Sequence, residues 1–229
     1  MPNRFELYAF WRTSATYRVR VAMNLKGLTA DEHQINLIEG QQRDPAFLKI
    51  NPMGAIPALI DREAPPDQAH EPITQSLAIL EFLDEIAPTP PLLPRDPHGR
   101  ARVRSLANLL AADTHPMITP RVRGYLTKSA GFDDAAWKAW QTHWFTTGLQ
   151  GFEARLTQPG TGAFCHGDTV TTADICLASI IVVMRVFAIT VPAIPTIDRI
   201  MAHCETLEAF AHAAPNRQLG APPQLGAPA

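Results

Sequence analysis

The feature that most limits the fold of this chain is a proline-rich segment over residues 87–97. It contains Pro88, Pro90, Pro91, Pro94 and Pro97. Each proline lacks a backbone N–H and fixes its own φ, so the segment is expected to form a stiff, extended linker. Short apolar runs alternate with helical patterns before it, whereas only helical patterns follow it. The sequence therefore predicts an α/β domain, a linker, an all-helical domain and an irregular tail, over residues 1–87, 88–97, 98–215 and 216–229.

The first of these parts carries strand and helix signals in alternation. Apolar runs predict strands over residues 6–10, 32–37, 58–61 and 72–74. Helical periodicity predicts helices over residues 19–27, 44–50 and 77–86, with Ser76 as the N-cap of the last. This order predicts a mixed sheet with helices on its faces, which is an α/β fold.

The second part contains helical patterns only. Helices are expected over residues 100–117, 133–156, 172–187, 197–203 and 207–213, and Pro116 and Pro120 are expected to kink or end the first of them. The tail repeats Gln-Leu-Gly-Ala-Pro, and its composition favours an irregular structure without a helix or strand.

Composition excludes several classes of function. The net charge of −2 gives no broad basic surface, so no nucleic-acid partner is expected. No apolar run approaches the roughly 20 residues of a membrane span, and the N-terminus has no signal-peptide pattern, so the expected location is the cytoplasm. Cys165, Cys176 and Cys204 form no CxxC motif and have no ligand-like histidine spacing, so neither a disulfide framework nor a metal site is expected.

Three short segments have the residue types of a binding site. Thr13, Ser14 and Thr16 stand where a strand leads into a helix, so a hydroxyl and open N–H groups there suit a thiolate; the alternative is a plain N-cap. A cis Pro57 would expose the backbone of Ile56 to an extended peptide ligand, although a rigid turn explains the same residues.

The third segment, Gln75-Ser76, opens the next predicted helix. Its hydroxyl and N–H groups suit a carboxylate, and an N-cap is again the alternative. A fourth segment, Thr171 to Asp174, matches a capping box and is interpreted as structural.

Taken in this order, the segments resemble the glutathione transferase superfamily over nearly the whole chain before the tail. The match rests on Asn51-Pro52-Met53 with Ile56-Pro57, on Gln75-Ser76 and on Thr171 to Asp174. Residues 11–27 (WRTSATYRVRVAMNLKG), with Gln41-Gln42 and His115-Pro116, are similar to the zeta class, which holds maleylacetoacetate and maleylpyruvate isomerases. The resemblance implies a thioredoxin-like domain followed by a helical domain. It also implies a homodimeric enzyme with glutathione as cofactor, a cis–trans isomerase or a glutathione transferase, with a place in aromatic amino acid degradation.

The resemblance also implies roles for single residues. Thr13 or Ser14 would stabilise the thiolate of glutathione. Its other contacts would come from Ile56, Pro57, Gln75 and Ser76, with Gln42 and His115 at the glycyl or the γ-glutamyl end. A small unsaturated or halogenated organic acid would be the substrate, held by arginines for which the candidates are Arg12, Arg121 and Arg185.

Two positions depart from the family pattern. Ala15 stands where the family usually has cysteine or threonine, and Val186 stands where the class has an arginine, with Arg185 one residue earlier. One residue along a helix is a rotation of about 100°, so Arg185 need not point where the side chain of residue 186 points. The alternative function is therefore a glutathione-binding protein of the same fold without isomerase activity. A disulfide reductase that uses two glutathiones is a third hypothesis.

Overall fold

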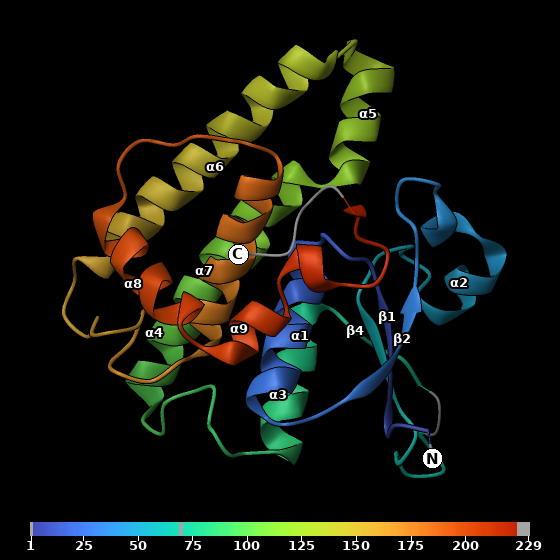
Figure 1. The fold of residues 1–229 in the computed structure, drawn as a ribbon, viewed down its shortest axis with the longest axis horizontal. Coiled ribbons are helices and arrows are strands. Elements are labelled where there is room, and N and C mark those ends of the chain that lie inside the picture. Colours follow the sequence, from blue (N-terminus) through green and yellow to red (C-terminus); the bar gives the residue numbers. More distant parts are fainter. Residues whose placement is uncertain (1, 69–70, 224–229) are drawn as a thin grey trace. The chain divides into compact units, whose positions relative to one another are not determined.

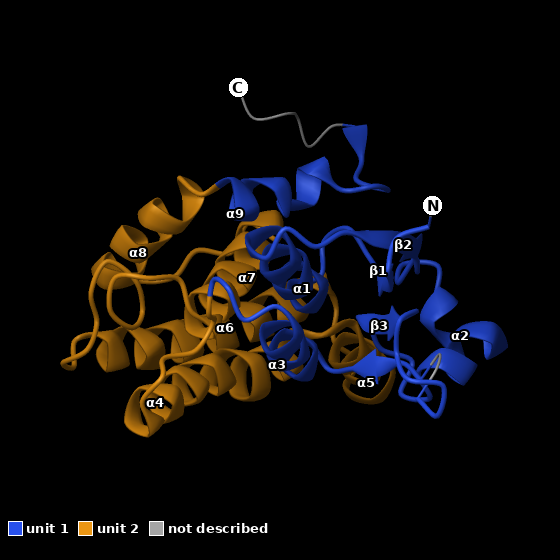
Figure 2. Cartoon of the chain, turned by 90° about the horizontal axis from the view of Figure 1, so that it is seen from below, with its two compact units in different colours: residues 1–90, 208–229 blue, residues 91–207 orange. Residues whose placement is uncertain are grey.

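A computed structural model of the chain describes residues 2–68 and 71–223, which form two compact units. Unit 1 is made of Met1–Pro90 and Glu208–Ala229, and unit 2 of Pro91–Leu207 (Figure 2). The units therefore part within the proline-rich segment. Helix α9 (Glu208–His212) belongs to unit 1, although its sequence pattern is continuous with the helical part. The domain bounds given above stay a prediction.

Unit 1 is a four-stranded mixed sheet with helices on both faces, as predicted. Its strands are β1 (Phe5–Ala9), β2 (Ala30–Gln34), β3 (Ala58–Asp61) and β4 (Ile73–Thr74), in the spatial order β2-β1-β3-β4. β1 pairs in parallel with β2 and antiparallel with β3, which pairs antiparallel with β4. Helices α1 (Ser14–Leu25) and α3 (Ser76–Ile86) cover one face and α2 (Pro45–Ile50) lies on the other (Figure 1).

Two predicted element bounds in unit 1 are wrong. β2 ends at Gln34, three residues before the predicted end. The prediction relied on the apolar Ile35 and Leu37, which follow the strand, whereas β2 itself has no buried residue. α1 begins at Ser14, five residues before the predicted start. Its residues 14–23 are all buried, so burial on every side replaces the one-sided apolar stripe of a surface helix.

A buried lysine fixes the end of unit 1 that leads into the linker. The Lys26 side chain is completely buried, and its Nζ donates to Asp84 Oδ1 at 2.8 Å, Ala87 O at 2.5 Å and Pro90 O at 2.9 Å. An ammonium group has three N–H donors, and all three are used here. Lys26 therefore ties α1 to α3 and to the first residues of the proline-rich segment.

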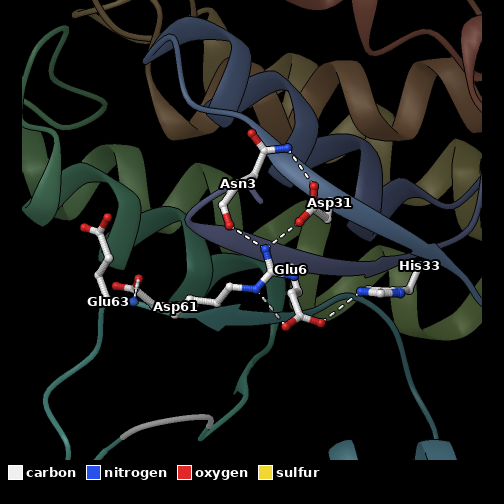
Figure 3. A network of polar contacts seen from close by, with 7 residues as sticks. Asn3, Glu6, Asp31, His33, Asp61 and Glu63 are labelled. Carbon is white, nitrogen blue, oxygen red and sulfur yellow. Dashed lines mark hydrogen bonds and ion pairs between the residues drawn. The ribbon is translucent and has the colours of Figure 1, made fainter. Parts of the chain in front are cut away.

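Charged side chains form a network at the end of the sheet where β1 begins. Arg4 donates to both carboxylate oxygens of Asp61, at 2.8 and 2.7 Å. Arg62 bonds Glu6 and Asp31, and Glu6 in turn contacts His33 (Figure 3). These contacts lower the pKa of Asp61 chiefly through the hydrogen bond from Arg4. The hydrogen bond from Arg62 likewise lowers the pKa of Asp31.

Acid is expected to destabilise the protein through this network. A carboxyl whose folded pKa lies below its unfolded value of about 3.9 stabilises the fold above that pH, and this contribution is lost as the pH falls through the folded pKa. Urea unfolding of the wild type and of Arg4→Gln should therefore differ at neutral pH, and the difference should shrink below about pH 4. Lys49→Gln removes an exposed charge that has no carboxylate partner among the described residues, and it should show no such convergence. An Arg4→Gln difference that is constant across pH would contradict the assignment.

Unit 2 is entirely helical among the residues that the structure describes. It contains α4 (Pro97–Asn108), α5 (Pro120–Ala130), α6 (Asp134–Leu156), α7 (Thr172–Val186) and α8 (Pro195–Glu205). α7 is its core, since residues 172–181 are all buried. The helix predicted over residues 100–117 is helical throughout and ends near Pro116 as expected, but only α4 is an α-helix, and a π-helix over Leu109–Thr114 and a 3-10 helix over His115–Ile118 continue it. Helix α5, which has no buried residue, was not predicted.

The capping box at the start of α7 is confirmed. Thr171 is the N-cap, and buried Asp174 accepts from Thr171 N at 2.8 Å, Thr171 Oγ1 at 2.8 Å and Cys165 N at 2.7 Å. Burial raises the pKa of Asp174, and these donors oppose the rise. Thr172 N also donates to Leu92 O at 3.0 Å, so the linker joins the same structure. The start of α7 is therefore held by the cap and by Leu92 of the linker.

The described repeat residues 218–222 contain no helix or strand, as predicted, and a 3-10 turn over Pro215–Arg217 stands just before them. Gln218 Nε2 donates to His212 O at 2.6 Å and to Ala214 O at 3.0 Å beside this turn. The first copy of the repeat, residues 218–222, follows this turn. The second copy, residues 224–228, lies outside the described residues.

Candidate functional site: the strand ends of unit 1

The sheet register brings the three predicted binding segments of unit 1 to one edge. Tyr8 near the end of β1 pairs with Ala58 at the start of β3, and Ala58 pairs with Thr74 at the end of β4. The loop that leads into α1, the peptide bond before β3 and the turn into α3 therefore lie at the same end of the sheet. β2 runs parallel to β1, so the segment that follows it and contains Gln42 starts from this end too.

Two neighbouring hydroxyls at the start of α1 differ in their hydrogen bonding. Thr13 is the N-cap: its Oγ1 accepts from Thr16 N at 3.4 Å and donates to Thr16 Oγ1 at 2.7 Å. Ser14 is 1% exposed, and its Oγ has no hydrogen-bond partner among the described residues. Burial of a hydroxyl without a partner costs about 1–3 kcal/mol of folding stability, so the Ser14 hydroxyl is a candidate for a hydrogen bond to a ligand. The N–H groups of Ser14 and Ala15 are open as well.

The predicted cis bond before Pro57 is present. Ile56, which precedes it, takes part in no backbone hydrogen bond in the part of the chain that the structure describes, so its N–H and C=O are open to a peptide-like ligand. Gly54 lies two residues earlier at φ +57, and a Cβ there would stand 2.7 Å from Gln42 O. This close approach requires glycine, and it places the backbone of Gln42 beside the Ile56 segment.

Gln42 contributes a second unpaired polar atom at this edge. Its Oε1 is buried and has no hydrogen-bond partner among residues 2–68 and 71–223. An amide oxygen in that state accepts from a donor such as the N–H of a ligand.

The start of α3 also has open backbone donors at this edge of the sheet. Gln75 has φ +70, an uncommon value for a residue other than glycine, and such strain concentrates at functional sites. The prediction that Ser76 is the N-cap is wrong: Ser76 is the first helical residue, Gln75 occupies the cap, and no side chain caps the helix. The first intrahelical bond runs from Ile79 N to Gln75 O, so three N–H groups before it stay open.

Sequence reasoning missed one residue of this region, Arg18. Its side chain is 2% exposed, and its Nη1 donates to Ser76 Oγ at 3.1 Å, so it joins α1 to the start of α3. The signal was present, because an arginine stands between the apolar residues Ala15, Val19 and Ala22 of a helix. A charge in such a place is buried only with a partner.

The predicted arginines have different surroundings. The Arg12 guanidinium lies 5.3 Å from the ring centre of Trp11 and 6.0 Å from that of Phe10, so two aromatic faces support it beside Thr13. In unit 2, Arg121 is an exposed residue near the start of α5, and His115 begins the 3-10 turn before it. Arg185 forms an ion pair with Glu205 of α8, so its charge already has a partner.

The described residues contain neither a metal-binding cluster nor a helix suited to span a membrane. No cluster of three or more histidine, cysteine, aspartate or glutamate side chains there is suited to hold a metal ion. None of the described helices combines the length and the apolar character that crossing a membrane requires.

A thioredoxin-like unit with its open groups at the strand ends, followed by a helical unit, is the architecture of a glutathione transferase. The N-terminal domain of glutathione S-transferases matches residues 3–85 of the chain. Maleylacetoacetate isomerase of Rhizobium meliloti is 39% identical, over 95% of this chain and 99% of that protein. Maleylpyruvate isomerase of a Ralstonia species is 38% identical, over 93% of this chain and 98% of that protein.

Solved structures agree with these relatives. A maleylacetoacetate isomerase from Methylobacterium extorquens AM1, crystallised with malonate and glutathione, has a TM-score of 0.89 and 46% identity over 95% of this chain and 99% of that one. A maleylpyruvate isomerase of the zeta class has a TM-score of 0.87 and 37% identity over 95% and 100%. The chain belongs to the glutathione transferase family, in its zeta class of maleylacetoacetate and maleylpyruvate isomerases. The predicted family and fold class are thereby confirmed.

Proposed function

We propose that the protein is a glutathione-dependent cis–trans isomerase that acts on a small unsaturated organic acid of the maleylpyruvate or maleylacetoacetate type. The observation that carries this function is the buried hydroxyl of Ser14 at the start of α1, which has no partner among the residues that the structure describes and stands beside two open N–H groups. Hydrogen-bond donors at a helix N-terminus stabilise an anion, and a thiol held there has a lower pKa.

The other open groups at this edge fit the rest of the tripeptide. The free backbone N–H and C=O of Ile56 match the cysteinyl main chain, and the start of α3 at Ser76 matches the γ-glutamyl carboxylate. Gln75 completes the γ-glutamyl contacts. Gln42 supplies its acceptor at the glycyl or the γ-glutamyl end, and His115 serves the same ligand.

Glutathione, when bound, supplies a thiolate that adds to the substrate double bond and leaves after rotation about the resulting single bond. Ser14 donates its hydroxyl proton to the sulfur in a hydrogen bond and keeps the thiol ionised. Arg12, supported on Trp11, and Arg121 hold the substrate carboxylates. Arg185 is the weaker of the three candidates, because Glu205 holds its guanidinium.

The two departures from the family pattern are compatible with catalysis. Ala15 contributes its backbone N–H, which any residue supplies, so the loss of a polar side chain there leaves the donors at the thiol in place. Val186 ends α7 and supplies no partner for a carboxylate, so that contact is left to the candidate arginines. The alternative, a glutathione-binding protein without isomerase activity, rests on the same two positions.

The third hypothesis, a disulfide reductase that uses two glutathiones, would need glutathione to supply the reacting sulfur, and a reductase assay tests it. Cys165, Cys176 and Cys204 are all buried, and burial raises the pKa of Cys165 and Cys204. Neither thiol has the thiolate character that disulfide exchange needs.

The decisive assay follows the isomerisation of maleylpyruvate and of maleylacetoacetate with and without glutathione, beside calorimetry of glutathione binding. We expect binding and turnover that depends on both protein and glutathione. Binding without turnover on either acid would favour the non-catalytic alternative. No binding would refute the cofactor assignment.

We also propose a homodimer in the cytoplasm, on the strength of the family resemblance. Sedimentation of the purified protein tests the first part, with twice the chain mass of 25.1 kDa expected. A single-chain mass at micromolar concentration would contradict it.

A further inference from the structure

The C-terminal segment of unit 1 runs back along α1, from the end of that helix toward the loop before it. Helix α9 packs against α1 (Figure 1), and Asn24 Nδ2, near the end of α1, donates to Ala209 O at 2.9 Å. Phe210 of α9 is buried. Further along the chain, the tail comes into contact with Trp11, just before the start of α1. The first part of the tail therefore belongs to the packing of unit 1.

The tail meets Trp11 at a turn in the first copy of the repeat. Ala221 N donates to Gln218 O at 3.1 Å, and Gly220 is the third residue of this four-residue turn, with φ +83. A positive φ at the third position favours glycine. A Cβ on Gly220 would stand 3.5 Å from Gln34 Oε1 and 3.9 Å from Trp11 Cδ1, which is van der Waals distance. The turn therefore lies against Trp11 and the end of β2.

Gln218 anchors this turn to the end of α9. Its Nε2 donates to the carbonyls of His212 and Ala214, which are groups that a helix end leaves open. Leu219, the next residue, is 69% exposed. Within the first copy of the repeat, the glutamine and the glycine thus hold the turn, whereas the leucine side chain points into solvent.

Trp11 connects this turn to the candidate site. It is 5% exposed, and the Arg12 guanidinium lies 5.3 Å from its ring centre. An aromatic face attracts a cation, and a guanidinium that is already held in place loses less freedom when a carboxylate binds it. A change in the packing of Trp11 should therefore reach Arg12. The open backbone of Ile56 and the start of α3 belong to other segments of unit 1.

We propose that residues 218–222 are a positioning segment for the acid substrate: the turn at Gly220 packs on Trp11 and so holds Arg12 in place for a substrate carboxylate. The inference rests on the proposed function, because it takes Arg12 as a carboxylate partner. The segment acts through Trp11 and not by contact with the substrate. Its displacement should weaken the binding of the organic acid and leave the binding of glutathione unchanged.

The main test compares Gly220→Val with wild type in the isomerase assay. A β-branched residue disfavours positive φ, so valine should open the turn and move the tail away from Trp11. We expect KM for the acid to rise about 3- to 10-fold, the range for the loss of a cation–π contact and of a pre-positioned cation. The kcat value and the calorimetric affinity for glutathione should stay unchanged. Equal losses for acid and glutathione, or no loss, would overturn the inference.

Leu219→Ser is the matched control, because it changes an exposed side chain in the same turn and leaves Gly220 in place. It should have the KM values of wild type. Tryptophan fluorescence tests the contact itself without any ligand. Acrylamide should quench Gly220→Val more strongly than wild type, and this difference should disappear in a Trp11→Phe background. Equal quenching of the two proteins would show that the turn does not cover Trp11, and the inference would fail.

Two deletions locate the effect within the tail. Removal of residues 219–229 keeps the Gln218 anchor and removes the turn, so it should reproduce the rise in KM for the acid. Removal of residues 224–229 keeps the turn and should leave KM unchanged. The opposite pattern would contradict the role of the first copy. Wild type that does not bind glutathione would contradict the proposed function, whereas wild type that binds and turns over with an unaffected Gly220→Val contradicts only this inference.

Discussion

Ser14→Ala should lower turnover with saturating glutathione by about 100- to 1000-fold, the usual loss when one donor to a developing or stabilised anion is removed. The side chain is buried, so alanine fits its place, and its Oγ has no other partner in the described structure to lose. The pKa of the bound thiol should rise in the variant. The ultraviolet absorbance of the thiolate, followed against pH with glutathione bound, measures that rise separately from turnover.

Thr13→Ala is the matched control for this prediction. Thr13 Oγ1 is engaged as the cap of α1, so its loss should cost about 1 kcal/mol of stability and change turnover little. A large loss of turnover in Thr13→Ala with a nearly active Ser14→Ala would reverse the assignment of the two hydroxyls. The hydrogen bonds thus decide between residues that the sequence leaves equivalent.

Asp174→Ala should produce the largest loss of stability, about 4 kcal/mol or more. The change leaves three buried donors at the start of α7 without an acceptor, and each such group costs about 1–3 kcal/mol. Asp174→Asn retains one amide oxygen and should cost less. Urea unfolding followed by circular dichroism measures both differences.

Asp198→Ala is the comparison for this second prediction. Asp198 is an exposed acidic residue in the first turn of α8, where the helix dipole favours it, so its loss should cost less than about 1 kcal/mol. If the two aspartate variants were equally stable, the buried hydrogen bonds of Asp174 would have little net value.

Elements with a clear hydrophobic period and clear end residues were predicted correctly from the sequence. β3 is found at the predicted residues 58–61 and α6 within one residue of its predicted start, because each has a clear period and a clear boundary. β2 was displaced because its residues are half-exposed at the sheet edge and carry no apolar signal. Helix α5 was missed for a related reason, since none of its residues is buried.

The candidate site was likewise predicted in part: its segments could be found from the sequence, but their convergence could not. The sequence predicted Ser14, Ile56-Pro57 and the start of α3 as separate segments, each with a structural alternative. Their convergence needs the pairing of Tyr8, Ala58 and Thr74, which is non-local and follows only from the assembled sheet. The bond between Arg18 and Ser76 spans 58 residues of sequence, so no spacing rule predicts it.

The position of β2 also has a consequence for handling the protein. β2 is an edge strand of the sheet, so one side of its backbone is available to pair with another chain. The charges of Asp31 and Glu32, each held by an arginine, protect that edge against such pairing. Acid that protonates Asp31 weakens the fold and removes a charge from this edge at once, so unfolding at low pH should be accompanied by aggregation through this strand.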